Sequence, residues 1–185
     1  MRVSRDVQIS KFMSLVLRHA PEEAGLVLDD NGWADFDQLC RVIETRFHAP
    51  KPDVERIVAE NPKKRFTLEG NRIRAAQGHS VAIDLDLSPS APPDVLYHGT
   101  KLEFLGPIFE QGLKSQSRQH VHLSKDIATA RIVAARRKGA DAILAVDSAT
   151  MAKDGTLFFL SENGVWLTSH VPSRYLKQLT EQEVS

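Results

Sequence analysis

The chain has 185 residues, of which 42% are hydrophobic and 26% are charged. This length suits one domain or two small ones, and the composition is that of an ordinary globular protein. Its 24 basic and 24 acidic residues balance, which excludes bulk electrostatic attraction to nucleic acid. Any polyanion would therefore have to be bound by a local cluster of cations.

Cysteine content and the first residues indicate the compartment. The single cysteine, Cys40, excludes an internal disulfide, and no pairing of residues suggests a zinc ribbon. The opening MRVSRDVQIS lacks the apolar core of a signal peptide, and no apolar run is long enough to cross a membrane. We expect a cytoplasmic protein with no membrane partner, acting as a monomer.

The first predicted helix ends in KFMSLVLRHAPEE, residues 11–23. Cations followed by a proline are an ordinary way to end a helix. The helix also carries an apolar stripe at three- and four-residue spacing, formed by Ile9, Phe12, Met13 and Val16. His19 falls on the same stripe, so we expect it against the core or in a cleft. There it is either a hydrogen-bonded core residue or, with Arg18, a source of a proton and a phosphate clamp.

The next elements are predicted to be a turn, two further helices and a hairpin. DDNGW predicts a turn, and helices are predicted over residues 35–47 and 51–61. In KRFTLEGNRIRAA, residues 64–76, alternating residues flank a tight-turn signal and predict a hairpin. Three short helices followed by a two-stranded wing predict a winged-helix lobe over residues 1–83. The Pro- and Ser-rich segment DLDLSPSAPPD then predicts a linker over residues 84–94.

Beyond the linker, residues 95–185 predict short strands with helices between them. Strands are predicted in VLYHGT, HVHLS and AILAVDS, helices in LEFLGPIFEQGL and KDIATARIVAARRKG, and two strands joined around ENG in GTLFFLSENGVWLTSHVP. In HVHLS the period of a strand places His120 and His122 on one face. A metal site is the alternative interpretation there, but no third ligand stands at a recognisable spacing, so we expect no metal.

Two stretches are rich in cations. Residues 63–80 carry five basic side chains against one acidic residue, and residues 114–138 are similarly one-sided. A solvated basic face explains most of these side chains, and a local phosphate site would explain some of them.

Several ordered motifs resemble the RNA 2'-phosphotransferase family. They are SKFMSLVLRHAPEEAGLVLDDNGWADFDQL, KKRFTLEGNRIRAAQGHS, LYHGT, HVHLS and FFLSENGVWLTSHVPSRYL. The resemblance covers nearly the whole chain and implies an α+β fold, in which the winged-helix lobe precedes a lobe of the ADP-ribosyltransferase fold. It also implies an enzyme of the tRNA-splicing type that consumes NAD and needs no metal, with RNA bearing a 2'-phosphate as its partner.

The implied reaction has two steps. The RNA 2'-phosphate attacks the anomeric ribose carbon of NAD and expels nicotinamide, which leaves a phospho-ADP-ribosylated RNA. The ribose 2''-hydroxyl then attacks phosphorus, which releases RNA with a 2'-hydroxyl and ADP-ribose 1'',2''-cyclic phosphate. The first nucleophile is already an anion, so the site needs cations that hold it rather than a general base.

The family's catalytic set is an Arg-His pair and two further arginines. In this chain these are Arg18, His19, Arg65 and Arg136. Arginine suits the task because its planar fork forms two parallel bonds to phosphate. Around Arg136 the chain departs from the family pattern, since Ala134 replaces a glycine and the segment after the arginine is longer. Arg137 therefore stays open as the functional arginine.

The family's NAD-binding positions lie in the second lobe. The resemblance assigns them to His98, Gly99, Thr100, Arg118, His122, Ser124 and Val165. His122 would replace the usual nicotinamide-stacking tyrosine of the fold, and Val165 would replace its catalytic glutamate. Losing that carboxylate suits a phosphate acceptor, which it would repel.

Two other functions remain. One is an NAD-dependent ADP-ribosyltransferase that acts on nucleic-acid phosphates and stops after the first step. The other is a winged-helix RNA-binding protein without catalysis. The arginine set and YHGT argue against the latter, because binding alone does not require an NAD lobe.

Overall fold

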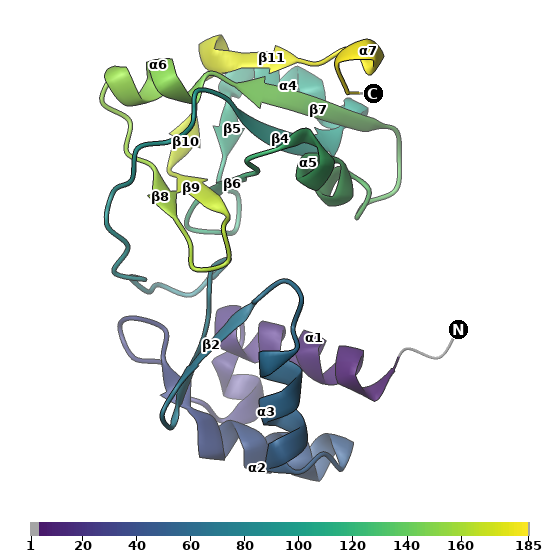
Figure 1. Cartoon of the computed structure of the whole chain (residues 1–185), viewed down its shortest axis with the longest axis vertical. Helices are drawn as coiled ribbons and strands as arrows, with labels where there is room; N and C mark the ends of the chain where they lie inside the picture. The colour runs from purple at the N-terminus through teal and green to yellow at the C-terminus, as the bar shows by residue number, and fades with distance from the viewer. Residues whose placement is uncertain (1–3, 185) are drawn as a thin grey trace. The chain divides into compact units, whose positions relative to one another are not determined.

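The computed structural model describes residues 4–184 of the chain (Figure 1). The chain divides into two compact units, Met1–Asp86 and Leu87–Ser185, so the division falls inside the Pro- and Ser-rich segment. Helices and small antiparallel sheets occur together, which is the α+β class that the sequence predicts. No helix among the described residues is both long and apolar enough to cross a membrane.

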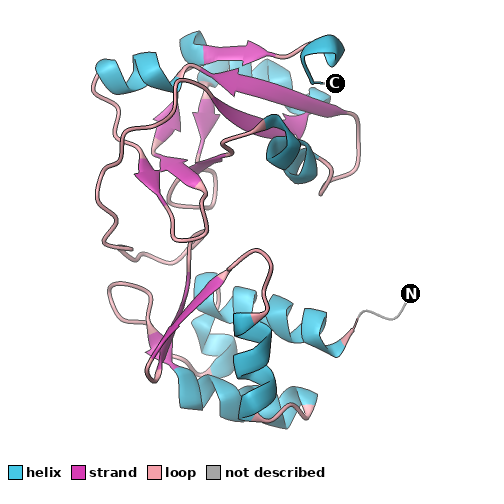
Figure 2. Ribbon diagram, in the orientation of Figure 1, coloured by secondary structure: helices cyan, strands magenta, loops and turns pink. Residues whose placement is uncertain are grey.

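The first unit packs helices on a small antiparallel sheet (Figure 2). Its helices are α1 (Arg5–Arg18), the 3-10 turn η1 (Pro21–Ala24), α2 (Phe36–Phe47) and α3 (Lys51–Ala59). Its strands are β1 (Ala34–Asp35), β2 (Phe66–Glu69) and β3 (Arg72–Ala75), in the order β1-β3-β2. The three predicted helices and the hairpin are therefore confirmed. Strand β1 was not predicted, because two residues carry no period.

Helix α1 begins and ends at capping residues. The Ser4 side chain accepts a hydrogen bond from the Val7 N–H at 3.4 Å. The predicted stripe is buried, and Leu17 joins it. The expectation that His19 packs against the core is wrong: it is the C-cap, with φ −130° and ψ −41°, and its side chain is exposed. Since the helix ends at Arg18, His19 no longer follows the helical period.

Helices α2 and α3 complete the core of the first unit. The Asp35 carboxylate caps α2 by accepting from the Gln38 N–H at 2.7 Å. The core contains fully buried side chains from every layer, among them Met13, Phe36, Leu39, Ile43, Val54 and Ile73. This apolar burial is the main stabilising term for a unit of this size and holds the C-terminal end of α1 in place.

The second unit contains short strands in small antiparallel sheets. Its strands are β4 (Leu96–Lys101), β5 (Leu113–Lys114), β6 (Val121–Leu123), β7 (Asp141–Val146), β8 (Phe159–Leu160), β9 (Trp166–Thr168), β10 (His170–Val171) and β11 (Leu176–Gln178). They pair in the orders β11-β7-β4, β6-β9-β8 and β10-β5. Its helices are η2 (Leu102–Phe104), α4 (Leu105–Gln111), α5 (Ile127–Ala134), α6 (Ser148–Lys153), η3 (Ser173–Tyr175) and α7 (Glu181–Val184).

Helix α5 lies directly on strand β4. A Cβ atom added to Gly99 would lie 1.9 Å from the Ala130 carbonyl oxygen and 2.9 Å from the Ala134 nitrogen. Gly99 therefore permits the close approach of helix α5 to strand β4. Gly99 faces α5, and because side chains alternate along a strand, His98 and Thr100 point to the opposite face of β4.

The segment between the two units is packed for part of its length. Asp84 donates its N–H to the Asp30 carbonyl at 2.7 Å in the first unit. In the second unit, Ser90 donates to the Phe158 carbonyl at 2.8 Å, and the Ser148 hydroxyl donates to the Pro93 carbonyl at 2.6 Å. The two ends of the segment expected as a linker are thus bonded to different units, Asp84 to the first and Ser90 and Pro93 to the second.

Candidate functional site

The residues expected at the site fall into two sets, one in each unit. In the first unit, Arg18 ends α1 and His19 caps it, with the His19 N–H donating to the Leu15 carbonyl at 2.9 Å. Arg18 is half-buried and stands in the last turn of the helix, where a cation is favourable. The helix end therefore places a guanidinium and an imidazole on consecutive residues.

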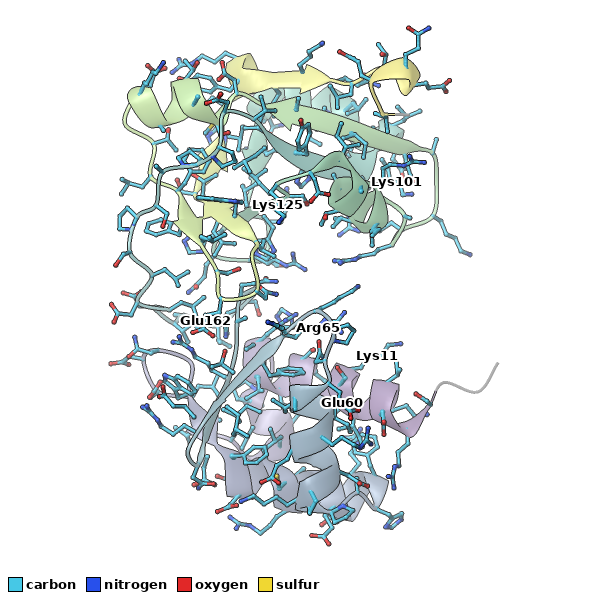
Figure 3. The ribbon with its side chains drawn as sticks, viewed as in Figure 1. Lys11, Glu60, Arg65, Lys101, Lys125 and Glu162 are labelled. Atoms are coloured by element: carbon cyan, nitrogen blue, oxygen red, sulfur yellow. The ribbon has the colours of Figure 1, made fainter. Side chains whose placement is uncertain are left out.

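A short segment after the hairpin connects Arg65 to this helix end. Arg65 directly precedes β2 (Figure 3), and its carbonyl accepts from the Ala76 N–H at 2.9 Å. Four residues later, the Ser80 N–H donates to the Arg18 carbonyl, also at 2.9 Å. Four residue steps span at most about 14 Å. The hairpin therefore brings Arg65 into the neighbourhood of Arg18 and His19.

The loop before Arg65 is held by a buried asparagine. The Asn61 side-chain oxygen accepts from the Lys63 N–H at 3.1 Å, and its carbonyl accepts from the Lys64 N–H at 2.9 Å. Lys64 adopts a left-handed conformation with φ +41°. The Asn61 amide also donates to the Ser10 hydroxyl on α1 at 3.4 Å. Asn61 therefore fixes the entry of the chain into Arg65, although no motif singled it out.

The helix end is a region of positive potential. His79, which is only 2% exposed, lies in it. Burial lowers the pKa of the His79 imidazole from 6.5 to about 4. The positive charges that add to this effect belong to Arg18, His19 and Arg74. Cations that disfavour a further positive charge at this place favour a bound anion there.

An aromatic residue organises the neighbouring arginines of β3. The Arg72 and Arg74 guanidinium carbons lie 4.7 Å and 4.6 Å from the centroid of the Trp33 ring. Arg74 also donates to the Asn31 carbonyl at 3.5 Å, and Arg72 pairs with Glu69. Arg72 and Arg74 are thus engaged with their own unit. Arg72 is exposed, as a solvated basic face predicts, whereas Arg74 is half-buried.

In the second unit, strands β4 and β6 bring the expected residues together. Tyr97 and Ser124 exchange two backbone hydrogen bonds of 2.8 Å, and the His98 Nδ1–H donates to the His122 carbonyl at 3.1 Å. Burial lowers the pKa of His98. His98 is therefore a neutral ring whose Nδ1 carries the proton, so its Nε2 is an acceptor.

Three arginines gather near His122. The Arg118 guanidinium donates to the His122 Nδ1 at 3.0 Å, which places the proton of a neutral His122 ring on Nε2. Burial lowers the pKa of Arg118, and the positive charges of Arg136 and then Arg137 lower it further. Such a cluster of guanidinium groups is suited to phosphate oxygens.

The two candidate arginines differ in their surroundings. Both follow the end of α5 at Ala134, so they lie in a turn rather than in the helix that the sequence predicts. The Arg137 guanidinium lies 6.0 Å from the Phe104 ring centroid, whereas Arg136 has the larger effect on Arg118. The larger effect on Arg118 thus favours Arg136 over Arg137 as the functional arginine.

Val165 lies at the same end of the β6–β9 pair as Ser124. Trp166, which directly follows Val165, pairs with Leu123, which directly precedes Ser124. The Val165 N–H donates to the Ser161 hydroxyl at 3.0 Å, which holds the turn between β8 and β9. An apolar, half-buried side chain therefore stands at the position where the resemblance implies a lost carboxylate.

The described residues, 4–184, contain no group of three or more His, Cys, Asp or Glu side chains that would hold a metal ion. His120, the other histidine of HVHLS, packs its ring 5.9 Å from the Phe159 ring, centroid to centroid. His122 contacts Arg118 instead. The two histidines thus have different partners although they share a strand period.

Both sets are anion-binding in character: arginines, a histidine that can transfer protons, and histidines whose tautomers are determined by their partners. The comparisons with known proteins agree with a protein that binds anions. The profile of the family described as "RNA 2'-phosphotransferase, Tpt1 / KptA family" matches residues 4–170. The chain belongs to this family, as the sequence motifs predict.

Several curated relatives carry the same name. A "Probable RNA 2'-phosphotransferase" from Rhizobium rhizogenes is 54% identical over 180 residues, which are 97% of each chain. Proteins with that name from Rhizobium johnstonii and Streptomyces coelicolor are 52% and 48% identical over 178 residues, in both cases 96% of this chain and 97% of the relative. The similarity therefore extends across both units.

Proposed function

We propose that this protein is an NAD-dependent RNA 2'-phosphotransferase, which removes an internal 2'-phosphate from RNA. The observation that carries the proposal is the Arg18–His19 pair at the end of α1, in a chain whose relatives are named for this reaction. We further propose that the first unit is a winged-helix lobe and the second an ADP-ribosyltransferase-fold lobe. The three helices and the following hairpin of the first unit support its assignment as a winged-helix lobe.

The donor set of the second unit fits NAD, which would be consumed as a substrate. Arg118 and Arg136 supply positive charge for the diphosphate. The neutral His98 offers its Nε2 as an acceptor on the adenosine side, and Thr100 lies on the same face of β4. Gly99 contributes to this site through packing, because it lets α5 and its following arginines approach the strand.

In the first step, the residues of the first unit hold the RNA 2'-phosphate. Arg18 and Arg65 bind its oxygens as planar donors, and neither has to remove a proton, because the nucleophile is already an anion. Val165 in the second unit carries no charge, whereas a carboxylate in its place would repel a phosphate. The expected product is phospho-ADP-ribosylated RNA, with nicotinamide released.

In the second step, negative charge builds up on the oxygens around phosphorus, and the RNA 2'-oxygen departs. The arginines stabilise the developing charge. His19 supplies the proton to the leaving oxygen, since imidazole exchanges protons near neutral pH. The products are RNA with a 2'-hydroxyl and ADP-ribose 1'',2''-cyclic phosphate.

The direct test is incubation of the protein with NAD and an oligoribonucleotide that carries one internal 2'-phosphate, followed by separation of the products. We expect nicotinamide, the dephosphorylated RNA and the cyclic phosphate of ADP-ribose in equal amounts. An ADP-ribosylated RNA as the only product would instead identify an ADP-ribosyltransferase that stops after the first step. No NAD-dependent product and no stabilisation by NAD in a thermal melt would leave an RNA-binding protein.

A further inference from the structure

Ser80 makes two contacts with the end of helix α1. Its N–H donates to the Arg18 carbonyl at 2.9 Å, and its hydroxyl oxygen lies 2.9 Å from the Nδ1 atom of His19. The Val81 N–H approaches the same Arg18 carbonyl at 3.4 Å. A serine that is 61 residues further along the chain than His19 is thus attached to both residues of the pair.

The backbone around Ser80 is held independently of this hydroxyl. His79, its neighbour, is buried, and Gly32 packs against it: a Cβ added to Gly32 would lie 3.3 Å from the His79 Nε2. Gly78 on the other side is buried as well. The Ser80 side chain itself is exposed. Its hydroxyl can therefore be changed without disturbing the core, and the position of its oxygen follows from the buried residues beside it.

The contact at Nδ1 bears on which nitrogen of His19 exchanges a proton, because the Ser80 hydroxyl can either accept from Nδ1–H or donate to a bare Nδ1. A neutral imidazole carries one proton, and its other nitrogen holds the lone pair. When the Ser80 oxygen accepts from an Nδ1–H group, Nδ1 stays protonated in both charge states of the ring. Proton gain and loss then occur at Nε2. In an imidazole without this partner, either nitrogen can carry the single proton.

We infer that Ser80 is a positioning residue, whose hydroxyl accepts from His19 Nδ1–H and thereby assigns proton transfer to Nε2. This inference rests on the proposed function for its consequence, because only a reaction that uses His19 as an acid gains from it. In the second step, Nε2–H gives its proton to the departing RNA 2'-oxygen, while Nδ1–H keeps its bond to Ser80. The attacking 2''-hydroxyl loses its proton to water, and the ring, left in the neutral Nδ1–H form, takes up a proton from water.

Four variants separate the hydroxyl from the shape of the side chain. Ser80→Ala removes the hydroxyl, and Ser80→Thr keeps it. Ser80→Val has the shape of Thr with a methyl group in place of the hydroxyl. Thr45→Ala is the matched control, because it removes an exposed hydroxyl of the same unit that bonds only to the Arg41 carbonyl in its own helix. Thermal unfolding of each variant checks that the unit is folded.

The first measurement is the ¹⁵N chemical shift of the two ring nitrogens of His19 at a pH where the ring is neutral. The chain has 7 histidines, so the His19 signals are assigned by their loss in His19→Ala. We expect a protonated Nδ1 and a bare Nε2 in the wild type, Ser80→Thr and Thr45→Ala. In Ser80→Ala and Ser80→Val the two signals should move toward each other or exchange. Identical shifts in all variants would overturn the inference.

The second measurement is the rate of each step with a 2'-phosphorylated oligoribonucleotide. Ser80→Ala and Ser80→Val should slow the second step by roughly tenfold, a part of what a general acid contributes, and leave the KM for NAD unchanged. Ser80→Thr should restore the rate. Changed nitrogen shifts with an unchanged second step in an active enzyme would also overturn the inference. If the wild type transfers no phosphate, the proposed function fails, and the nitrogen shifts alone decide whether Ser80 sets the tautomer.

Discussion

The exposure of His19 follows from the place where helix α1 ends. The apolar stripe of α1 predicts that His19 lies against the core or in a cleft, and the members of the stripe are buried as expected. The helix nevertheless ends at Arg18, because the chain turns there and its carbonyl bonds to the Ser80 N–H. A sequence reading cannot foresee this contact, since its partner is supplied by a segment beyond the hairpin. The resulting exposure of His19 suits a residue that has to reach a substrate.

At the residue scale, the first prediction concerns His19 and Arg65. His19→Ala and Arg65→Ala should slow the second step more than the first, because the first nucleophile is already an anion, whereas the second step must stabilise added charge and protonate a leaving oxygen. One such donor is worth roughly a hundredfold in rate. Gel analysis of the RNA should show phospho-ADP-ribosylated RNA accumulating in both variants.

The control for this experiment is Lys11→Ala, which removes an exposed cation of α1 that is not assigned to the site. It should react like the wild type, without a visible intermediate. Uniformly slower reactions with no intermediate in His19→Ala and Arg65→Ala would show that these residues act in the first step or in binding.

The second prediction at this scale concerns His79 and pH. The pKa of His79 is about 4 in the folded state and near 6.5 when unfolded, so between these values the unfolded chain binds more protons. The free energy of unfolding should therefore fall as the pH falls from about 6.5 to about 4, by about 3 kcal/mol at most. Above pH 6.5 the group should have no effect.

Urea unfolding followed by the fluorescence of Trp33 measures this effect in the first unit, in a background where Trp166 of the second unit is replaced by Phe. His79→Gln cannot titrate and should show a flatter dependence of stability on pH between 4 and 6.5. An equal slope with and without the imidazole would mean that other groups cause the acid sensitivity.

At the scale of elements, the sequence predicts what has a period and misses what depends on partners. Helices α1, α2 and α3 and the β2–β3 hairpin follow from apolar spacing and turn residues. Strands of two residues, such as β1 and β5, exist only through their pairing with distant strands. Helix α5 ends five residues before the end of the segment predicted for it, because Ala135 caps it. Arg136 and Arg137 consequently lie in a turn.

The prediction at this scale tests the packing of α5 on β4. In Gly99→Ala the new methyl group would overlap the Ala130 carbonyl, to which its distance would be 1.9 Å. Because backbone atoms on both sides are fixed by the sheet and the helix, we expect a loss of about 3 kcal/mol in the free energy of unfolding. The turn that carries Arg136 should shift with the helix, so NAD affinity should fall as well.

Gly106→Ala is the matched control, since a Cβ there would meet no atom within 4 Å. Its residue lies in α4, where alanine is the better helix former, so the variant should be as stable as the wild type or about 0.5–1 kcal/mol more stable. Thermal and urea unfolding compare the two variants. Equal stability of Gly99→Ala and Gly106→Ala would contradict the packing that the structure shows.

At the scale of the whole molecule, the candidate residues are divided between two compact units joined within a Pro- and Ser-rich segment. The sequence predicts this organisation because its texture changes there from helices with a hairpin to short strands. The hydrogen-bond partners that orient the site residues could not be predicted. Ser80 with His19, Arg118 with His122 and Asn61 with the loop before Arg65 all depend on tertiary contacts.

One prediction at this scale concerns metals. The proposed chemistry assigns charge stabilisation to arginines and proton transfer to His19, so no step requires a divalent cation. We expect the rate of phosphate removal to be unchanged after dialysis against EDTA and in assays that contain it. A loss of turnover that Mg²⁺ or Mn²⁺ restores would show that a cation takes part in charge stabilisation.

The last prediction follows from the balance of charge over the whole chain. With 24 basic and 24 acidic residues, the protein lacks the excess of cations that holds nucleic acid irrespective of its sequence. On the proposed function, affinity comes from the local cations at the end of α1, which would recognise a phosphate monoester at the ribose 2'-position. Two oligoribonucleotides that differ only in this phosphate should differ in Kd by tenfold or more at about 0.15 M salt, measured without NAD so that no turnover occurs. Arg18→Ala should remove most of the difference by weakening only the phosphorylated ligand, while Lys11→Ala should preserve it. Equal affinity for both oligonucleotides would mean that the RNA backbone, rather than the 2'-phosphate, determines binding.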